Sequence, residues 1–189
     1  MSLKDKAKWD KKYLDTPKLL QKRKPSQKLV KFSNYFNGTQ ALDFASGNGR
    51  NSIYLASLGF NVDAYDISEV ALENLSANKI KNITTKQIDL DNFEAQKKYD
   101  LIVKCNYLDR TAIKKLSDAL NKNGFMIIET YMHHPSNTKP DSNPDFLLQA
   151  DELKTFFDEG FEVLEYDEFD NEPNELYRMR KQSIVVRKK

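Results

Sequence analysis

Residues 41–68 hold the pattern that most restricts the fold of this chain. An apolar run leads into a turn that contains Gly47 and Gly49, a helical stretch follows, and a second apolar run ends at Asp66. Two strands joined through a helix lie parallel, and such crossovers are almost always right-handed. We therefore expect this segment to start an open, mostly parallel sheet.

The same alternation continues along the chain. Apolar periodicity and turn residues predict seven strands, at residues 40–45, 60–65, 83–88, 99–104, 125–131, 161–169 and 183–187. Helices are predicted between them, at residues 51–58, 68–79, 111–120 and 150–157. No apolar helix separates the last two strands, so these should pair antiparallel. The prediction is a doubly wound α/β fold with a seven-stranded, mostly parallel sheet and a C-terminal antiparallel hairpin.

We expect a single domain, because 189 residues is a usual domain length. Residues 37–189 would form the α/β core, and residues 1–36 a helical segment in front of it. Residues 3–14 have the pattern of a short helix, and Ser26 is placed to cap a second one. Nothing in this pattern predicts the oligomeric state.

Composition excludes several classes of protein. The one cysteine, Cys105, permits no internal disulfide and fits a reducing cytoplasm. One cysteine and two adjacent histidines make a poor ligand set, so we expect no metal. No apolar run approaches membrane-spanning length, and the charged start, MSLKDKAKWDKK, is unlike a signal peptide. The expected location is the cytoplasm, without a membrane partner.

Charge is unevenly distributed although the net charge is only +2. Residues 4–31 are rich in lysine, residues 151–175 are acidic, and residues 178–189 are basic again. This asymmetry fits an anionic partner such as RNA, or simply a solvated surface.

The turn after the first strand is the candidate nucleotide site. The helix behind Gly49 offers free N–H groups, and ligands of open α/β sheets bind beyond the carboxyl ends of the strands. Asp66 ends the second strand, where a carboxylate can accept both hydroxyls of a ribose. Asp43 approaches the turn, and Asp89-Leu90 ends the third strand, where a side chain can meet an adenine amino group.

A dinucleotide site is the alternative reading of this turn. Gly47-x-Gly49-x-x-Ser52 resembles an imperfect fingerprint of NAD(P)-binding oxidoreductases, with the third glycine missing. A carboxylate at Asp43 suits a cationic group better than a pyrophosphate, which favours a different nucleoside ligand.

The segment DFASGNG, residues 43–49, is similar to the D-x-G-x-G-x-G motif of class I S-adenosylmethionine-dependent methyltransferases, with Ala45 in place of the first glycine. The continuation RNSIYLA, residues 50–56, resembles the tellurite-resistance (TehB-like) subgroup. The resemblance covers about residues 25–187 and implies the Rossmann-like fold of that class.

This resemblance implies S-adenosylmethionine as the methyl donor and in-line transfer of its methyl group, for which positioning and desolvation supply much of the rate. It implies a small-molecule acceptor, such as a metalloid oxyanion or another soft nucleophile. The implied donor-binding residues are Asp43, Ala45, Ser46, Gly47, Asn48, Gly49, Asn51, Asp66, Ile67, Asp89, Leu90, Asn106 and Arg23. Arg23 would meet the donor's carboxylate.

Asn106-Tyr107 stands where methyltransferases that act on amino groups of bases often carry N/D-P-P-Y. The prolines are missing, which argues against a base amine as acceptor. An RNA methyltransferase stays as an alternative, as does a binding module without catalysis.

Three residues are candidates for catalysis. His133, beside His134, follows the fifth strand and could act as a general base or lie exposed. Residues 175–178, ELYR, resemble a late segment of the tellurite-resistance subgroup that carries a catalytic His-Arg pair. Tyr177 stands in place of that histidine, while Arg178 matches and suits an oxyanion through its paired N–H donors.

The N-terminal segment is a candidate lid. Trp9, Tyr13 and the basic residues 22–24 precede the core, and N-terminal segments of this superfamily often cover the donor site. The simpler interpretation is a loosely docked amphipathic helix.

Overall fold

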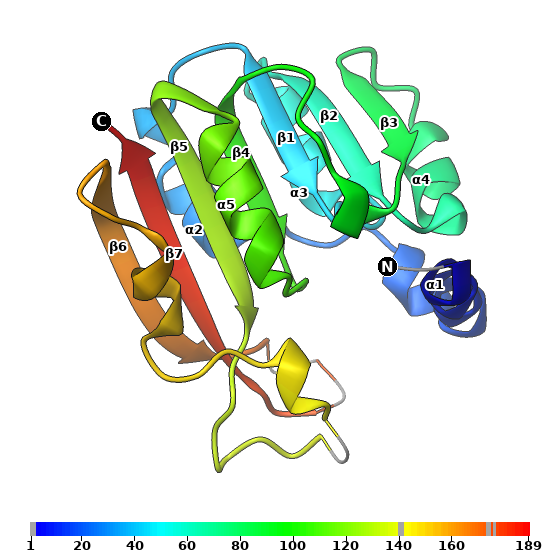
Figure 1. Ribbon diagram of the computed structural model, residues 1–189. Coiled ribbons are helices and arrows are strands. Elements are labelled where there is room, and N and C mark those ends of the chain that lie inside the picture. The colour runs from blue at the N-terminus through cyan, green and yellow to red at the C-terminus, as the bar shows by residue number, and fades with distance from the viewer. Residues whose placement is uncertain (1–2, 140–141, 173–174, 176) are drawn as a thin grey trace.

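A seven-stranded sheet with helices on both faces forms the molecule (Figure 1), in a computed structural model that describes residues 3–139, 142–172, 175 and 177–189. The strands are β1 Gln40–Phe44, β2 Asn61–Asp66, β3 Ile83–Gln87, β4 Tyr99–Cys105, β5 Leu120–Tyr131, β6 Phe161–Asp170 and β7 Arg180–Lys188. Their order is β3-β2-β1-β4-β5-β7-β6. β1 to β5 run parallel, whereas β7 is antiparallel to both β5 and β6. The predicted fold class is confirmed.

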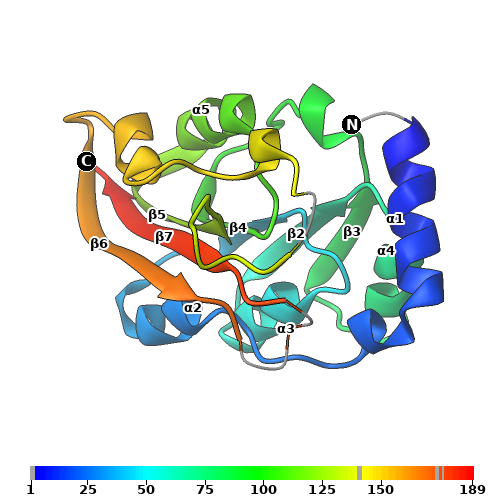
Figure 2. The same ribbon diagram turned by 90° about the horizontal axis from the view of Figure 1, so that it is seen from below.

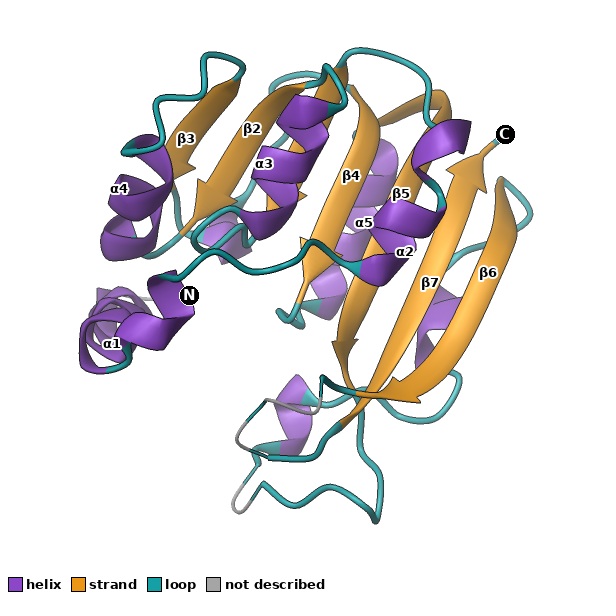
Figure 3. Cartoon of the chain, turned by 180° about the vertical axis from the view of Figure 1, so that it is seen from behind, coloured by secondary structure: helices purple, strands orange, loops and turns teal. Residues whose placement is uncertain are grey.

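The α-helices are α1 Leu3–Asp15, α2 Gln27–Lys31, α3 Arg50–Ser57, α4 Glu69–Ser76 and α5 Arg110–Asp118. Helices α2, α3 and α4 lie on one face of the sheet and α5 on the other (Figure 3). In the part of the chain that the structure describes, no helix is both long and apolar enough to cross a membrane.

Side chains of each strand alternate between two apolar layers. Leu42 and Phe44 of β1 pack in the layer that includes Ile113 and Leu116 of α5. Ala41, which precedes Leu42 on the strand, packs in the opposite layer, which includes Leu29 of α2 and Leu55 of α3. All of these side chains are buried, so the sheet is covered on both faces and its strand ends are the places left for a ligand.

Two predicted elements differ from the structure. The helix predicted at residues 150–157 is a short 3₁₀ helix, Glu152–Phe156, and Asp151 before it has φ 59°. A residue in the left-handed region cannot belong to a right-handed helix, so the helix begins later than predicted. Strand β5 starts earlier than predicted, at Leu120, directly after α5. The pairing of β4 with β5 is irregular there, and Asn123 has φ 63°.

Candidate functional site

The parallel strands end at one edge of the sheet, and the turn after β1 lies there. Ala45, Gly47 and Gly49 all have positive φ angles of 62°, 54° and 80°. A Cβ atom on Gly49 would lie 2.3 Å from the Leu75 side chain, so this glycine is required by both backbone and space. The turn is tight and leads straight into α3.

Asp66 supports this turn from the neighbouring strand β2. Its carboxylate accepts hydrogen bonds from the Gly47 N–H (2.7 Å) and the Ser68 N–H (2.9 Å), and the residue is 8% exposed. Burial raises the pKa of Asp66, while backbone hydrogen bonds from Ser68, Gly47 and Ile67 oppose the rise. The structure thus brings Asp66 to the turn, as expected from its position in the sequence.

Asp43 lies deeper, within β1. Its carboxyl accepts the Ser52 hydroxyl of α3 at 2.6 Å, and burial raises its pKa to about 6. Asp43 therefore joins the strand to α3 below the turn.

At the end of β3, Asp89 accepts the Asp91 N–H (3.1 Å) and the Asn92 side-chain amide (2.9 Å) and so caps a short 3₁₀ turn. Leu90 of that turn and Ile67 after β2 are buried, with exposures of 1% and 5%. One carboxylate and two apolar side chains thus lie beyond the ends of β2 and β3.

Several buried polar atoms near the turn have no partner among the described residues. They are Ser46 Oγ, Asn48 Oδ1 and Asn106 Oδ1. Ser46 and Asn48 belong to the turn, and Asn106 follows β4, which pairs with β1 in the sheet. Buried polar atoms are normally hydrogen-bonded. Oxygen acceptors left open in this way suit a ligand that brings N–H donors, such as an ammonium group.

Helix α1 packs beside α4 at the same edge (Figure 2). Asp10 accepts the Ser68 hydroxyl at 2.7 Å and the Val70 N–H at 3.3 Å. Lys6 pairs with Asp10 at 2.8 Å and with Glu69 at 3.0 Å. The helix is therefore attached at the N-terminus of α4, next to Asp66.

Tyr13 of α1 lies over the turn. A Cβ atom on Gly47 would lie 2.7 Å from the Tyr13 hydroxyl, and Tyr13 is 8% exposed. Burial and the nearby Asp66 raise the pKa of Tyr13, so its hydroxyl stays protonated. Behind it, the Asn48 side-chain amide donates to the Gln21 carbonyl at 3.1 Å. The turn is covered by the N-terminal segment.

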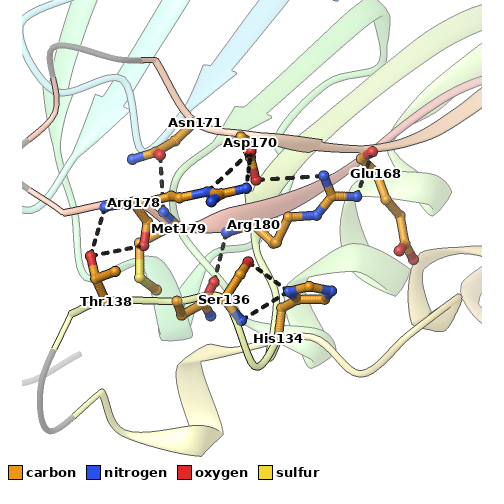
Figure 4. Close-up of polar contacts among 10 residues, drawn as sticks. His134, Ser136, Thr138, Glu168, Asp170, Asn171, Arg178, Met179 and Arg180 are labelled. Atoms are coloured by element: carbon orange, nitrogen blue, oxygen red, sulfur yellow. Dashed lines mark hydrogen bonds and ion pairs between the residues drawn. The ribbon is translucent and has the colours of Figure 1, made fainter.

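Arg178 lies on the β6–β7 hairpin (Figure 4), where its Nε and Nη2 donate to Asp170 Oδ2 at 3.2 and 2.8 Å. Its side chain is 59% exposed, and Asp170 also lies 3.5 Å from Arg180. Tyr177 is 37% exposed, and its neighbour Leu176 lies outside the described residues. Arg178 is thus held in a surface ion pair.

The remaining predicted site residues differ in exposure and in hydrogen bonding. His133 is exposed, and its backbone N–H donates to the Leu148 carbonyl at 2.8 Å. His134 instead shapes the loop, with its Nδ1 2.7 Å from the Ser136 hydroxyl. Arg23 is exposed in the linker after α1, and Asn51 is buried.

A buried charged cluster was missed by the sequence analysis. Glu129 of β5 and Lys181 of β7 form an ion pair at 3.1 Å, with side chains only 8% and 4% exposed. Ser26 does not cap α2 with its hydroxyl, which instead donates to Glu129 at 2.9 Å. The available signal was a charged residue within the apolar run FMIIETYM, residues 125–132.

Comparisons with known proteins show the family of this chain. The family model of "Tellurite resistance protein TehB" matches residues 1–186. Two relatives from Haemophilus influenzae, strains 10810 and KW20/Rd, are named "Probable S-adenosyl-L-methionine-dependent methyltransferase TehB". Each is 32% identical over 140 residues, which cover 68% of this chain and 48% of the relative. The chain thus spans about half the length of these relatives.

Solved structures show the same architecture. The crystal structure of TehB from Haemophilus influenzae superposes with a TM-score of 0.78 and 27% identity, over 87% of this chain and 62% of that one. The glycopeptide N-methyltransferase MtfA in complex with S-adenosylmethionine superposes with a TM-score of 0.62 over 86% of both chains. Its 17% identity makes it a likeness of fold alone.

Proposed function

Since this chain belongs to the TehB family of tellurite resistance proteins, we propose that it is an S-adenosylmethionine-dependent methyltransferase that acts on a small-molecule acceptor. The observation that carries the proposal is the turn at Gly47 and Gly49, with the Asp66 carboxylate bound to its backbone at the edge of a parallel sheet. We place the reaction in the cytoplasm, in keeping with the single buried thiol of Cys105.

The residues around the turn fit this donor. Asp66 would accept the ribose hydroxyls, and the apolar side chains of Ile67 and Leu90 would pack on the adenine. Asp89 would meet the adenine amino group. The unpaired oxygens of the turn and of Asn106 fit the ammonium group of the methionine moiety.

The donor supplies an activated methyl group. The residues of the chain have to position the donor and the acceptor and to exclude water. Tyr13 and the rest of α1 lie over the turn, so we propose that residues 1–36 act as a lid that opens for donor exchange. The Asp10 contacts with Ser68 and Val70 would hold the lid closed.

We propose Arg178, Tyr177 and His133 as residues of the acceptor side. The guanidinium of Arg178 suits a metalloid oxyanion such as tellurite through paired N–H donors. Because Asp170 occupies that guanidinium here, an anionic acceptor would have to displace the carboxylate. We therefore expect weak acceptor binding that tightens when Asp170 is replaced by Asn.

Calorimetry with S-adenosylhomocysteine and NAD⁺ tests the donor assignment. S-adenosylhomocysteine should bind and NAD⁺ should not. The turn offers oxygen acceptors for an ammonium group, and the Asp43 carboxylate that lies below the turn would repel a pyrophosphate. Formation of S-adenosylhomocysteine from S-adenosylmethionine, with tellurite or selenite supplied, then tests turnover. Binding of NAD⁺ alone would show that the chain is a dinucleotide-binding protein.

A further inference from the structure

Lys104, near the end of β4, is a buried lysine without an acidic partner. Its side chain is fully buried, and it faces α5, because Ile102 two residues earlier packs in the layer with that helix. In the part of the chain that the structure describes, Nζ donates to the Tyr107 carbonyl and forms no ion pair. An unpaired charge is costly to bury. A lysine kept at such a cost indicates a role beyond packing.

The contacts of Lys104 are all with Tyr107. Nζ donates to the Tyr107 carbonyl and lies 5.0 Å from the centroid of the Tyr107 ring. Between the two residues, Asn106 has a φ angle of 59°, in the left-handed region that side chains rarely adopt. The Asn106 N–H donates to the Glu129 carbonyl of β5 at 2.7 Å. Lys104 therefore closes the turn after β4 and fixes both the backbone and the ring of Tyr107.

Tyr107 reaches from this turn to another one. Its hydroxyl donates to Asp91 Oδ1 at 3.0 Å, and its ring lies 6.1 Å from the Phe44 ring of β1. Asp91 belongs to the 3₁₀ turn Leu90–Asn92 after β3. Strands β3 and β4 are not neighbours in the sheet, because β2 and β1 lie between them. The contact therefore crosses the edge of the sheet at which a ligand would bind.

Charged groups surround the two side chains. Burial lowers the pKa of Lys104 to about 7, with a further decrease from Arg110 and opposing effects of Asp109 and Cys105. Burial and nearby carboxylates raise the pKa of Tyr107, so its hydroxyl stays protonated and remains a donor. The acids that face Tyr107 are Asp109 before α5, Asp89 and Asp91 after β3, Asp5 of α1 and Asp66 of β2.

We propose that Lys104 is a positioning residue that, through Tyr107, ties the turn after β4 to the turn after β3 across the ligand edge of the sheet. The tie fixes Asp89 and Leu90 relative to Asn106. When Lys104 loses its proton, the attraction of the ammonium for the Tyr107 ring is lost and the tie weakens. The effect on a ligand rests on the proposed function, whereas the tie itself does not.

Amide hydrogen exchange measures the tie directly. One reporter is the Asn106 N–H, and the other is the Asn92 N–H, which donates to the Asp89 carbonyl at 3.1 Å. At about pH 6, where Lys104 carries its proton, Lys104→Met should accelerate exchange at both about fivefold or more. Amides of β1 should not change, which separates this effect from a general loss of stability.

Lys98→Met is the matched control, because Lys98 also donates to a backbone carbonyl, that of Asp118, at the opposite end of β4. It should change neither reporter. If Lys104→Met leaves the Asn92 amide as slow as in the unchanged chain, the proposed tie is wrong.

Tyr107→Phe tests the route without a change at Lys104. It keeps the carbonyl and the ring that Lys104 contacts and removes only the bond to Asp91. Exchange at Asn92 should accelerate as in Lys104→Met, while exchange at Asn106 should stay within about twofold. Equal acceleration at both amides, or at neither, would overturn the route through Tyr107.

A pH profile distinguishes positioning by a charged lysine from simple filling of space. In the unchanged chain, exchange at Asn92, divided by the rate of an unfolded peptide at the same pH, should rise about fivefold between about pH 6 and pH 8, as Lys104 loses its proton. In Lys104→Met it should be fast at both pH values. A flat profile in the unchanged chain, or the same rise in the variant, would exclude a role of the proton.

Calorimetry with S-adenosylhomocysteine connects the tie to the proposed function. At about pH 6, Lys104→Met and Tyr107→Phe should each weaken binding about threefold or more, and the double variant should be no weaker than the weaker single one, because both act on one tie. If the unchanged chain does not bind this ligand, the proposed function fails, while the exchange results still decide the tie. If both variants bind as tightly as the unchanged chain, Lys104 does not position the ligand.

Discussion

Replacement of Asp66 by Ala should separate two roles of one carboxylate. In the folded protein it accepts the buried N–H groups of Gly47 and Ser68, at 2.7 and 2.9 Å. Each amide left without an acceptor costs about 1–3 kcal/mol of unfolding free energy. The hydrogen bonds that we propose between Asp66 and the ribose would be lost as well, which should weaken S-adenosylhomocysteine binding by about 1–3 kcal/mol, or about 5- to 150-fold in Kd.

The assays are urea unfolding for stability and calorimetry for binding, at a temperature where the variant is folded. Asp63→Ala is the matched control, because Asp63 also lies on β2 and accepts the Tyr99 hydroxyl at 2.7 Å. It should lose stability without change in Kd. A folded Asp66→Ala protein that binds S-adenosylhomocysteine as tightly as the unchanged chain would refute the reasoning.

Two further predictions concern the proposed lid and the core. Asp10→Ala removes the contacts with Ser68 and Val70. Amide hydrogen exchange in residues 3–15 should therefore accelerate about fivefold, as expected when the attachment of α1 loses about 1 kcal/mol. Unchanged exchange would mean that other contacts hold α1 in place. Burial lowers the pKa of Lys104 to about 7, while the unfolded chain keeps this proton up to about pH 10.5. The free energy of unfolding should therefore rise between about pH 7 and pH 10.5. Lys104→Met should be more stable at pH 7 and should lack that rise in urea titrations. Parallel plots of unfolding free energy against pH for the two proteins would contradict this.

The sheet was predictable because its signals are local. Apolar periodicity between turns marked most strands, and the glycines marked the turn after β1. The exceptions came from tertiary contacts. Ser26 looks like a helix cap, but its hydroxyl binds Glu129, which is distant in sequence. That hydrogen bond, together with one that the Ser26 backbone N–H donates to the Asn51 side-chain oxygen at 2.9 Å, fixes the start of a short α2.

The candidate site was predictable in part for the same reason. Asp66 and the glycines were found because strand ends and turns have fixed places in a parallel sheet. The sequence presents Arg50 only as part of a motif, since no sequence pattern can show that its Nη2 is buried with no partner among the described residues. The pairing of Arg178 with Asp170 likewise depends on how the β6–β7 hairpin closes.

The strand order has a consequence for how the protein is made. In the described part of the chain, β6 joins the sheet only through β7, although β6 is synthesised first. A growing chain therefore carries residues 161–170 without a partner, and β5 with a free edge, until residues 180–188 have emerged. Unpaired edges invite pairing with other chains. The glutamates and aspartates of β6 give the unpaired strand a negative charge. This charge opposes association with copies of the same strand on neighbouring ribosomes.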